Sequence, residues 1–378
     1  MGGSSHSYLP CYYLKRNSES RLGFNRTMKI ALVTDTHWGV RNDSKAFLDY
    51  FDKFYNNIFF PEVEKRGIDT VIHLGDITDR RKYISYVTLR RMKDTFISKL
   101  EKYDTHVIIG NHDVPYKNSN DINSMQELFN KHDIKYYSEP ETLTFDGCDI
   151  LLMPWINNEN YNQAIQAMRE TPAQIMFGHL EIAGCLMMRG MFNEHGMKIE
   201  DFNKFEMVAS GHFHTRSVNQ NIHYLGCPYE LTWSDYQDPK GFHIFDTDTR
   251  ELEFVRNPYS MFNKIFYTDQ EKDLDQVLDF NFEPYRETYV KVVKNSVDNP
   301  YWFDRFMDEL IKVEPINIQV VDDHLNLDLE DDEDLVNEAE DTLTILSKHI
   351  DGMGDTVPKK RLDNLMRSLY NEALHMEV

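Results

Sequence analysis

Short apolar runs alternate with amphipathic stretches between residues 28 and 260. The apolar runs predict strands over 29–33, 70–74, 106–110, 149–153, 173–177 and 206–210. A helical pattern follows the first strand and is expected to end at Pro61, and a second helical pattern covers about 85–102. An Asp-Thr-Asp-Thr turn within 242–255 predicts a hairpin. Strands that alternate with helices in this way predict a layered α/β domain.

A smaller α+β unit is predicted over residues 261–325. Strands are expected at 263–267, 287–293 and 316–321, with a helix near 301–312. Of the twenty residues 322–341, eleven are Asp or Glu and none is Lys or Arg, which predicts a solvated acidic linker over 326–341.

The two ends of the chain differ from the rest. Residues 1–27 are polar and lack periodicity, so we expect an N-terminal extension without chemistry of its own, either flexible or added to the natural start. Residues 335–378 carry two helical patterns, at 335–350 and 358–374, and each has an apolar stripe with little nearby to bury it. They predict a helical tail that packs on something else.

Composition narrows the classes of protein. No apolar run approaches the ~20 residues that span a bilayer, and no secretory signal is evident, so we expect a cytoplasmic protein without a membrane partner. The four cysteines are scattered and form no CxxC pair, which disfavours a zinc knuckle or a disulfide framework. The net charge of −22 argues against tight, unaided binding to nucleic acid.

Candidate metal ligands follow five of the predicted strands. Because ligands gather outside the carboxyl ends of strands in α/β sheets, these side chains are expected to converge. Glycines precede several of them, at 75, 110, 178 and 211, and are expected to permit tight turns. The candidates are Asp35, His37, Asp76, Asn111, His112, His179, His212 and His214.

Imidazole and carboxylate suit manganese, iron or zinc, whereas the absence of thiolate disfavours a structural zinc site. A carboxylate can bridge two cations, which together activate water and clamp a phosphoryl group. Any one of these residues alone would more often be structural, and His73, inside a strand, is expected to be a core histidine. The ordered set D-x-H, G-D-x-x-D, G-N-H-D, G-H and G-H-x-H is far harder to obtain by chance.

This ordered set resembles the calcineurin-like metallophosphoesterase superfamily over residues 28–256. The resemblance implies a β-sandwich flanked by helices that holds two divalent metal ions, with manganese expected first and iron or magnesium as alternatives. It implies one metal on Asp35, His37, Asp76 and His214, and another on Asp76, Asn111, His179 and His212. His112 then resembles the group that stabilises the transition state or protonates the leaving oxygen.

Within the superfamily the chain resembles the SbcD type, the nuclease subunit of SbcC/SbcD repair and recombination complexes, including those of T-even phages. GNHD, the segment from Ile222 to Asp246 and the order nuclease domain, capping domain, helical tail carry this likeness. It implies a manganese-dependent DNA exo/endonuclease that forms a homodimer. The tail helices would dock on an SbcC-like SMC-family ATPase.

Two further residues are expected near the chemistry. GDITDRR is similar to the phosphoprotein phosphatases, which predicts that Asp79 orients His112 and that Arg80 contacts substrate phosphate; a surface ion pair between the two is the alternative. Arg80 belongs to a basic cluster that forms either a DNA phosphate path, an exposed helix face or a subunit contact. Its members are Arg80, Arg81, Lys82, Arg90, Arg91 and Lys93.

Two other functions compete with a DNA nuclease. The first is a phosphoesterase for a phosphoprotein or a nucleotide, but such an enzyme has no evident use for the C-terminal unit and tail. The second is a metal-free scaffold, but a degenerate scaffold is expected to lose ligands, and every expected ligand is present.

Overall fold

The computed structural model describes residues 27–322 together with Ile350, Lys359 and Leu362. The predicted N-terminal extension, acidic linker and helical tail therefore lie outside the described residues, apart from Thr27 and those three positions. Within the described part, no helix is long and apolar enough to cross a membrane. Cys148, Cys185 and Cys227 are buried there.

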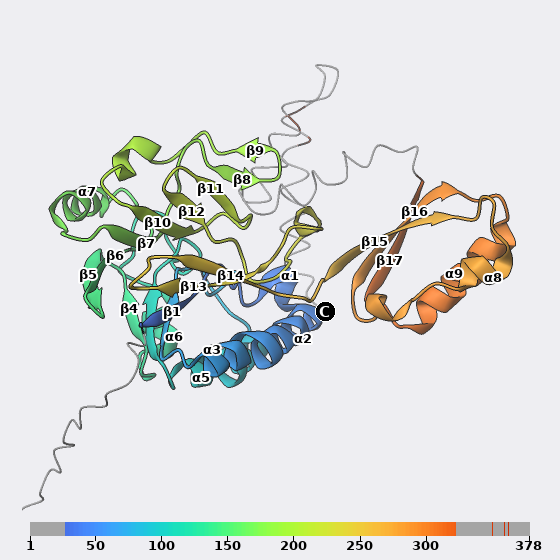
Figure 1. The fold of residues 1–378 in the computed structure, drawn as a ribbon, viewed down its shortest axis with the longest axis horizontal. Helices are drawn as coiled ribbons and strands as arrows, with labels where there is room; N and C mark the ends of the chain where they lie inside the picture. The colour runs from blue at the N-terminus through green and yellow to red at the C-terminus, as the bar shows by residue number, and fades with distance from the viewer. Residues whose placement is uncertain (1–26, 323–349, 351–358, 360–361, 363–378) are drawn as a thin grey trace, which may run out of the picture.

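Two six-stranded sheets form the larger part of the fold (Figure 1). The strands β1–β4 of the first sheet run parallel to one another, as do β6, β7, β10 and β12 of the second. Strands β13, β5 and β11 pair antiparallel with β1, β6 and β12. The first sheet has the order β14 (Leu252–Arg256), β13 (Gly241–Asp246), β1 (Lys29–Val33), β2 (Thr70–His73), β3 (Asp104–Ile108) and β4 (Lys135–Tyr137). The second has the order β11 (Ser217–Asn219), β12 (Ile222–Tyr224), β10 (Met207–Gly211), β7 (Ile175–His179), β6 (Cys148–Met153) and β5 (Glu141–Phe145).

Strand alternation divides the core into layers. In β1, Ile30 and Leu32 pack with Ile175 and Phe177 of the opposite sheet, because successive side chains point to opposite faces. Ala31 and Val33 belong instead to the cluster under the helices that cover the first sheet. A third cluster lies on the outer face of the second sheet, beneath α7 (Tyr161–Glu170). The result is the predicted β-sandwich flanked by helices.

The long helical run after β1 corrects one prediction. It continues through α2 (Lys45–Phe54), a π-helical segment (Tyr55–Phe59) and α3 (Phe60–Arg66), so the expected end at Pro61 is wrong. Proline lacks an N–H and clashes with the preceding turn in a regular helix interior, but it is tolerated in a first turn. The π segment ends just before Pro61 and places it in the first turn of α3.

The remaining elements of the sandwich are short. The helical stretch predicted at 85–102 is present as α4 (Tyr86–Met92), a π segment (Lys93–Ile97) and α5 (Ser98–Leu100). The sequence did not predict α1 (Val40–Asp43), α6 (Ser124–Phe129), or the two-stranded sheet of β8 (Leu186–Met188) and β9 (Met191–Phe192). Elements of two to six residues are too short to show a period.

The predicted strands and helix beyond residue 261 are also present. Strands β15 (Phe262–Thr268), β16 (Tyr289–Ser296) and β17 (Asn317–Asp322) form a parallel three-stranded sheet. Helices α8 (Leu274–Leu278) and α9 (Pro300–Lys312) belong to its own core cluster. The division into catalytic and capping domains stays a prediction, because Phe262 and Tyr289 also pack on Phe47 of α2.

A buried carboxylate joins this small sheet to the sandwich. Glu230 is 4% exposed, and its Oε2 atom accepts hydrogen bonds from the main-chain N–H groups of Met261 (2.6 Å) and Phe262 (2.8 Å). Burial raises the pKa of Glu230 to about 7, although the two N–H groups favour its charged form. The stabilisation by this contact therefore depends on whether Glu230 is protonated.

The variant Glu230→Gln tests this pH dependence. The pKa is about 7 in the folded chain and about 4.5 in the unfolded chain, so the folded state binds more protons between these values. The free energy of unfolding should fall by about 2–4 kcal/mol as the pH rises from 4.5 to 7 on account of this group. Urea unfolding at several pH values across that range should show a smaller change of unfolding free energy with pH in the variant. Glu251→Gln, at an exposed position, is the control, and an equal dependence on pH in all three proteins contradicts the assignment.

Candidate metal centre

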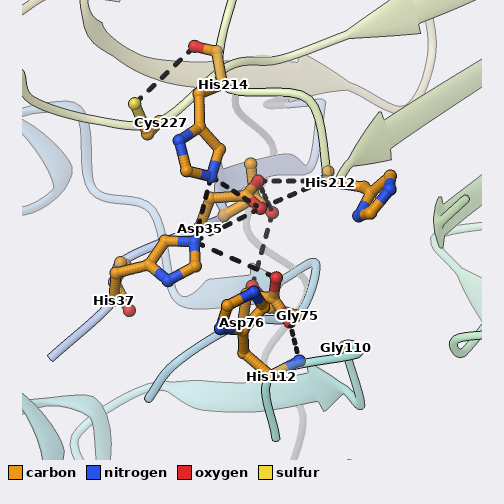
Figure 2. Close-up of polar contacts among 12 residues, drawn as sticks. Asp35, His37, Gly75, Asp76, Gly110, His112, His212, His214 and Cys227 are labelled. Carbon is orange, nitrogen blue, oxygen red and sulfur yellow. Dashed lines mark hydrogen bonds and ion pairs between the residues drawn. The ribbon is translucent and has the colours of Figure 1, made fainter. Parts of the chain in front are cut away.

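The candidate ligands leave the carboxyl ends of five strands that face one another across the sandwich. Residues Asp35 and His37 follow β1, and Asp76 follows β2. The third strand of the first sheet, β3, leads to Asn111 and His112. From the second sheet, His179 ends β7, and His212 and His214 follow β10. The described residues thus bring together all eight side chains that the sequence singled out, and Figure 2 labels all of them except Asn111 and His179.

The main chain is strained at this edge of the sheets. Four of the candidates have positive φ angles: Asp35 (51°), His37 (42°), Asp76 (58°) and His212 (89°). Each such residue costs about 1–3 kcal/mol and persists only where the surroundings impose it, typically at functional sites. The concentration of four among the candidate ligands therefore marks this edge as the functional one.

The glycines before these residues act mainly by close approach rather than by turning. Of Gly75, Gly110, Gly178 and Gly211, only Gly75 has a positive φ (101°), so the expected turn role holds for that position alone. A Cβ atom on Gly110 would lie 2.2 Å from Oδ1 of Asp76, and one on Gly211 would lie 2.1 Å from Oγ1 of Thr34. Only hydrogen fits at these two positions.

One group of candidates surrounds a first point. The Nε2 atoms of His37 and His214 lie 3.0 Å apart, and each lies 4.0 Å from Oδ1 of Asp35. The main-chain N–H of His212 donates to both oxygens of Asp35 at 3.1 Å, which fixes the carboxylate (Figure 2). Oδ2 of Asp76 lies 3.9 Å from Nε2 of His37, so this carboxylate borders the same point.

A second group surrounds a neighbouring point. Oδ2 of Asp76 lies 3.2 Å from Nε2 of His179. Oδ1 of Asn111 lies 2.9 Å from both Nε2 of His179 and Nδ1 of His212. The other oxygen of Asp76, Oδ1, accepts a hydrogen bond of 2.7 Å from the main-chain N–H of His112. Asp76 is therefore the one carboxylate common to both groups.

The donor atoms fit divalent cations. Nδ1 of His179 lies 2.8 Å from the carbonyl oxygen of Leu74 and must donate to it, so the lone pair of Nε2 in the neutral ring faces two oxygen atoms. Without a cation, that contact requires a second proton: burial lowers the pKa of His179, but Asp76 outweighs it and raises the pKa to about 9. A metal ion satisfies the same lone pairs, and imidazole, carboxylate and amide suit manganese or iron.

Charge at the centre is arranged around Asp76. Burial disfavours its charged form, yet His179 and His112 hold the pKa of this carboxyl well below its usual range. Burial also holds the pKa of His212 well below the ordinary value of histidine, and the charge of His179 adds to this. The centre thus combines an ionised carboxylate with a neutral imidazole, which is the state that binds metal.

The orientation of His112 differs from the expected one. We expected the Asp79 carboxylate to hold this ring, but Nδ1 of His112 lies 2.5 Å from the main-chain carbonyl oxygen of Asp79. The Asp79 carboxylate lies 3.4 Å from Nδ1 of His37. The reason is local: Asp79 donates its own main-chain N–H to Trp38, which places its side chain beside the loop of His37.

Arg80 pairs with Asp43 instead of Asp79, so the alternative of an ion pair with Asp79 is wrong, whereas its predicted phosphate contact stays a prediction. The guanidinium of Arg80 donates to Asp43 at 2.9 Å and to Asn42, and it stacks on Tyr83. The rest of the basic cluster divides: Arg91 pairs with Asp52 at 2.7 Å, whereas Arg81 lines the cleft over the metal centre. Arg80 and Arg91 are thus already paired with carboxylates, and Arg81 is the member of the cluster that borders the cleft.

That cleft has a volume of about 770 Å³. Basic and apolar side chains border it beside the candidate ligands. Sequence reasoning did not single out Arg41 or Lys117, which also border the cleft, because both residues stand in short segments without a pattern. The residues around the ligands include Arg81, Lys117, Trp155, Met187, Met188 and Leu231.

Sequence reasoning also assigned no role to Asp113, the last residue of GNHD. This side chain is 1% exposed and accepts hydrogen bonds from the N–H groups of Asp76 (2.8 Å), Ile77 (3.0 Å), Thr78 (3.3 Å) and Gly110 (3.0 Å). It thereby ties the loop after β2 to the loop after β3. Burial and the charge of Asp76 raise the pKa of Asp113 to about 6, despite these hydrogen bonds.

Comparison with known proteins agrees with this geometry. Residues 28–216 match the calcineurin-like phosphoesterase family. The chain belongs to this family. Its similarity extends further to Exonuclease subunit 1 of Enterobacteria phage T4, which is 32% identical over 352 residues, covering 92% of this chain and 99% of that protein.

Two solved structures show weaker likeness. An archaeal phosphodiesterase is 15% identical with a TM-score of 0.32, covering 61% of this chain and all of its own. A protein of unknown function from Aquifex aeolicus is 20% identical with a TM-score of 0.27, covering 47% of this chain and 94% of its own. TM-scores this low carry no argument. Family membership and the T4 relative make this calcineurin-like phosphoesterase a hydrolase of phosphate esters.

Asp113→Asn should loosen the candidate centre. In either orientation, the amide NH₂ would face two of the four main-chain N–H donors. Unsatisfied buried donors should lower the free energy of unfolding by about 2–4 kcal/mol, measured by urea denaturation. Asp133→Asn, at an exposed position, should stay within about 0.5 kcal/mol of wild type. Equal stability of the two variants would contradict the role of Asp113.

Asp79→Asn should weaken metal binding through His37. From the sequence we expected reduced turnover with unchanged metal content, but the carboxylate lies against His37 instead of His112. Loss of a carboxylate that supports a ligating histidine typically costs 10–100-fold in affinity or activity. Manganese titration by calorimetry should therefore show about that loss in one of two sites. Unchanged affinity at both sites would contradict this role and favour the one predicted from the sequence, in which Asp79 orients His112.

Proposed function

We propose that this calcineurin-like phosphoesterase is a metal-dependent DNA exo/endonuclease and the nuclease subunit of an SbcC/SbcD-type repair or recombination complex. The observation that carries the proposal is the convergence of seven side chains on two adjacent points, with Asp76 common to both. The proposed ligands of the first metal are Asp35, His37, Asp76 and His214. Those of the second are Asp76, Asn111, His179 and His212.

Two divalent cations, which we take to be manganese, would activate a water and neutralise charge on the phosphate. The protein holds His112 ready for proton transfer. Its Nδ1 proton is committed to the carbonyl oxygen of Asp79, and burial lowers its pKa, which favours the neutral ring, in which Nε2 carries a lone pair. That atom can take a proton during attack and deliver it to the departing sugar oxygen.

DNA as substrate rests on the relative and on the cleft. The T4 protein is an exonuclease subunit by name, and it aligns with nearly the whole chain. Arg81 and Lys117 border the cleft and supply local positive charge in a protein of net charge −22. Guanidinium and ammonium groups beside a metal pair suit the phosphates that flank a scissile bond.

Partner subunits complete the proposal. The word "subunit" in the name of the T4 relative supports a multi-chain assembly. The segment that would bind an SbcC-like ATPase, residues 335–378, lies outside the described residues except at Ile350, Lys359 and Leu362. For a homodimer, support comes from the start of α4, where Tyr83, Tyr86 and Val87 are 66%, 91% and 66% exposed. Neighbouring exposed apolar side chains of this size commonly mark a protein contact.

A nuclease assay with ligand variants tests the function. Wild-type protein should degrade end-labelled duplex DNA when manganese is present, and an SbcC-like ATPase should alter that cleavage. Asn111→Ala and His212→Ala should each reduce the rate by more than about a hundredfold. Loss of a metal ligand should cost more activity than the roughly 10–100-fold that follows loss of a residue bonded to a ligand. His195→Ala removes an exposed histidine and is the matched control.

The outcomes separate the competing functions. Hydrolysis of p-nitrophenyl phosphate or cyclic nucleotides with no cleavage of DNA would favour another phosphate ester. Metal-free purified protein that takes up no manganese would favour a scaffold. Manganese-dependent cleavage retained by both ligand variants would refute the metal assignment.

A further inference from the structure

A second cavity adjoins the cleft over the metal centre. It has a volume of about 480 Å³ and lies between the segment after β6 and the segment after β7. Trp155 and Glu181 line both this cavity and the cleft, so the two spaces share a wall. Its size lies within the ~300–1,000 Å³ of small-ligand pockets, which suits one nucleotide rather than a duplex.

Trp155 is held firmly at this boundary. Its N–H donates to the carbonyl oxygen of Ile109 at 2.8 Å. Its own carbonyl oxygen accepts hydrogen bonds from the side-chain amides of Asn120 (2.8 Å) and Asn160 (2.9 Å). Asn157 donates in turn to Oδ1 of Asn120 at 3.0 Å, and both of these asparagines are buried. Such a satisfied network of buried amides fixes the main chain of Trp155, from which the indole projects.

The indole lies against the proposed ligands. Its ring centroid is 5.1 Å from that of His212 and 6.2 Å from that of His179, while Trp155 itself is only half-buried. A substrate strand whose phosphate lies at the metal centre would therefore pass this ring with its adjacent nucleotide.

The other walls of the cavity suit a base better than a phosphate. Tyr161, the first residue of α7, contributes a second aromatic ring and is 48% exposed. The carboxylates of Glu181 and Asp201 repel a phosphate, whereas a carboxylate can accept a hydrogen bond from a base amino group. Lys198 supplies one cation for the backbone of the strand.

We propose that this cavity is a subsite for the unpaired base next to the scissile phosphate, with Trp155 and Tyr161 as its stacking surfaces. The inference rests on the proposed nuclease function and deepens it, because a base can enter only from single-stranded or unpaired substrate. Stacking on aromatic side chains tolerates every base, so the subsite would select strandedness rather than sequence.

Abasic substitution combined with mutation tests the subsite. Single-stranded oligonucleotides that contain one abasic position, moved stepwise past the cleaved bond, should show a raised KM at one step. Stacking losses predict a change of about 5- to 100-fold. In Tyr161→Leu that penalty should shrink or vanish, because the variant has already lost the contact, and Tyr161→Phe should restore it.

A second pair of variants and a small substrate complete the design. Trp155→Leu should reduce oligonucleotide cleavage more than it reduces hydrolysis of bis(p-nitrophenyl) phosphate, and Trp155→Phe should recover most of the difference. Calorimetric manganese titration of each variant detects any disturbance of His212. Tyr301→Ala removes an exposed aromatic ring of α9 and serves as the control.

The results distinguish the two hypotheses. If the abasic penalty is the same in wild type, Tyr161→Leu and Trp155→Leu at every step, the subsite is refuted while the nuclease function stands. If wild-type protein hydrolyses bis(p-nitrophenyl) phosphate but cleaves no DNA, the nuclease function itself fails, and the subsite fails with it.

Discussion

The hydrogen bonds that Asp113 accepts are the constraint on which the candidate centre depends. Two loops that belong to neighbouring strands must approach until Asp76 and Gly110 nearly touch, and one buried carboxylate satisfies N–H groups from both. This contact places Asp76 where the two groups of candidate ligands can share it. Strained main-chain angles at Asp35, His37 and Asp76 are tolerable because the surrounding loops are tied in this way.

The sandwich explains why the candidate ligands come from distant parts of the chain. Each sheet places the carboxyl ends of its central parallel strands at one edge, and the core between the sheets sets the distance between those edges. Two carboxylates, one amide and two imidazoles come from the first sheet, and three more imidazoles come from the second. Neither sheet alone supplies a complete set for the second point, where Asn111 of one sheet meets His179 and His212 of the other.

Much of this arrangement could be predicted from the sequence. Strand periodicity located β1, β2, β3, β6, β7 and β10, and the polar residues after five of them are the ones that meet. The failures occurred where the outcome depends on neighbours distant in the chain. Pro61 is tolerated because a π segment precedes it, and Arg80 turns to Asp43 because α1 stands beside it. Side-chain partners such as that of Asp79, and the acceptor role of Asp113, arise from loop conformations that no periodicity records.

A centre assembled across the seam of the sandwich has a mechanical consequence. Metal ions bound by both Asn111 of one sheet and His212 of the other would link the two sheets and stabilise their packing. Anything that binds the folded chain alone adds to its cohesion through mass action. Metal binding and thermal stability would then be linked. A chelator would lower the stability of the whole sandwich as well as remove activity.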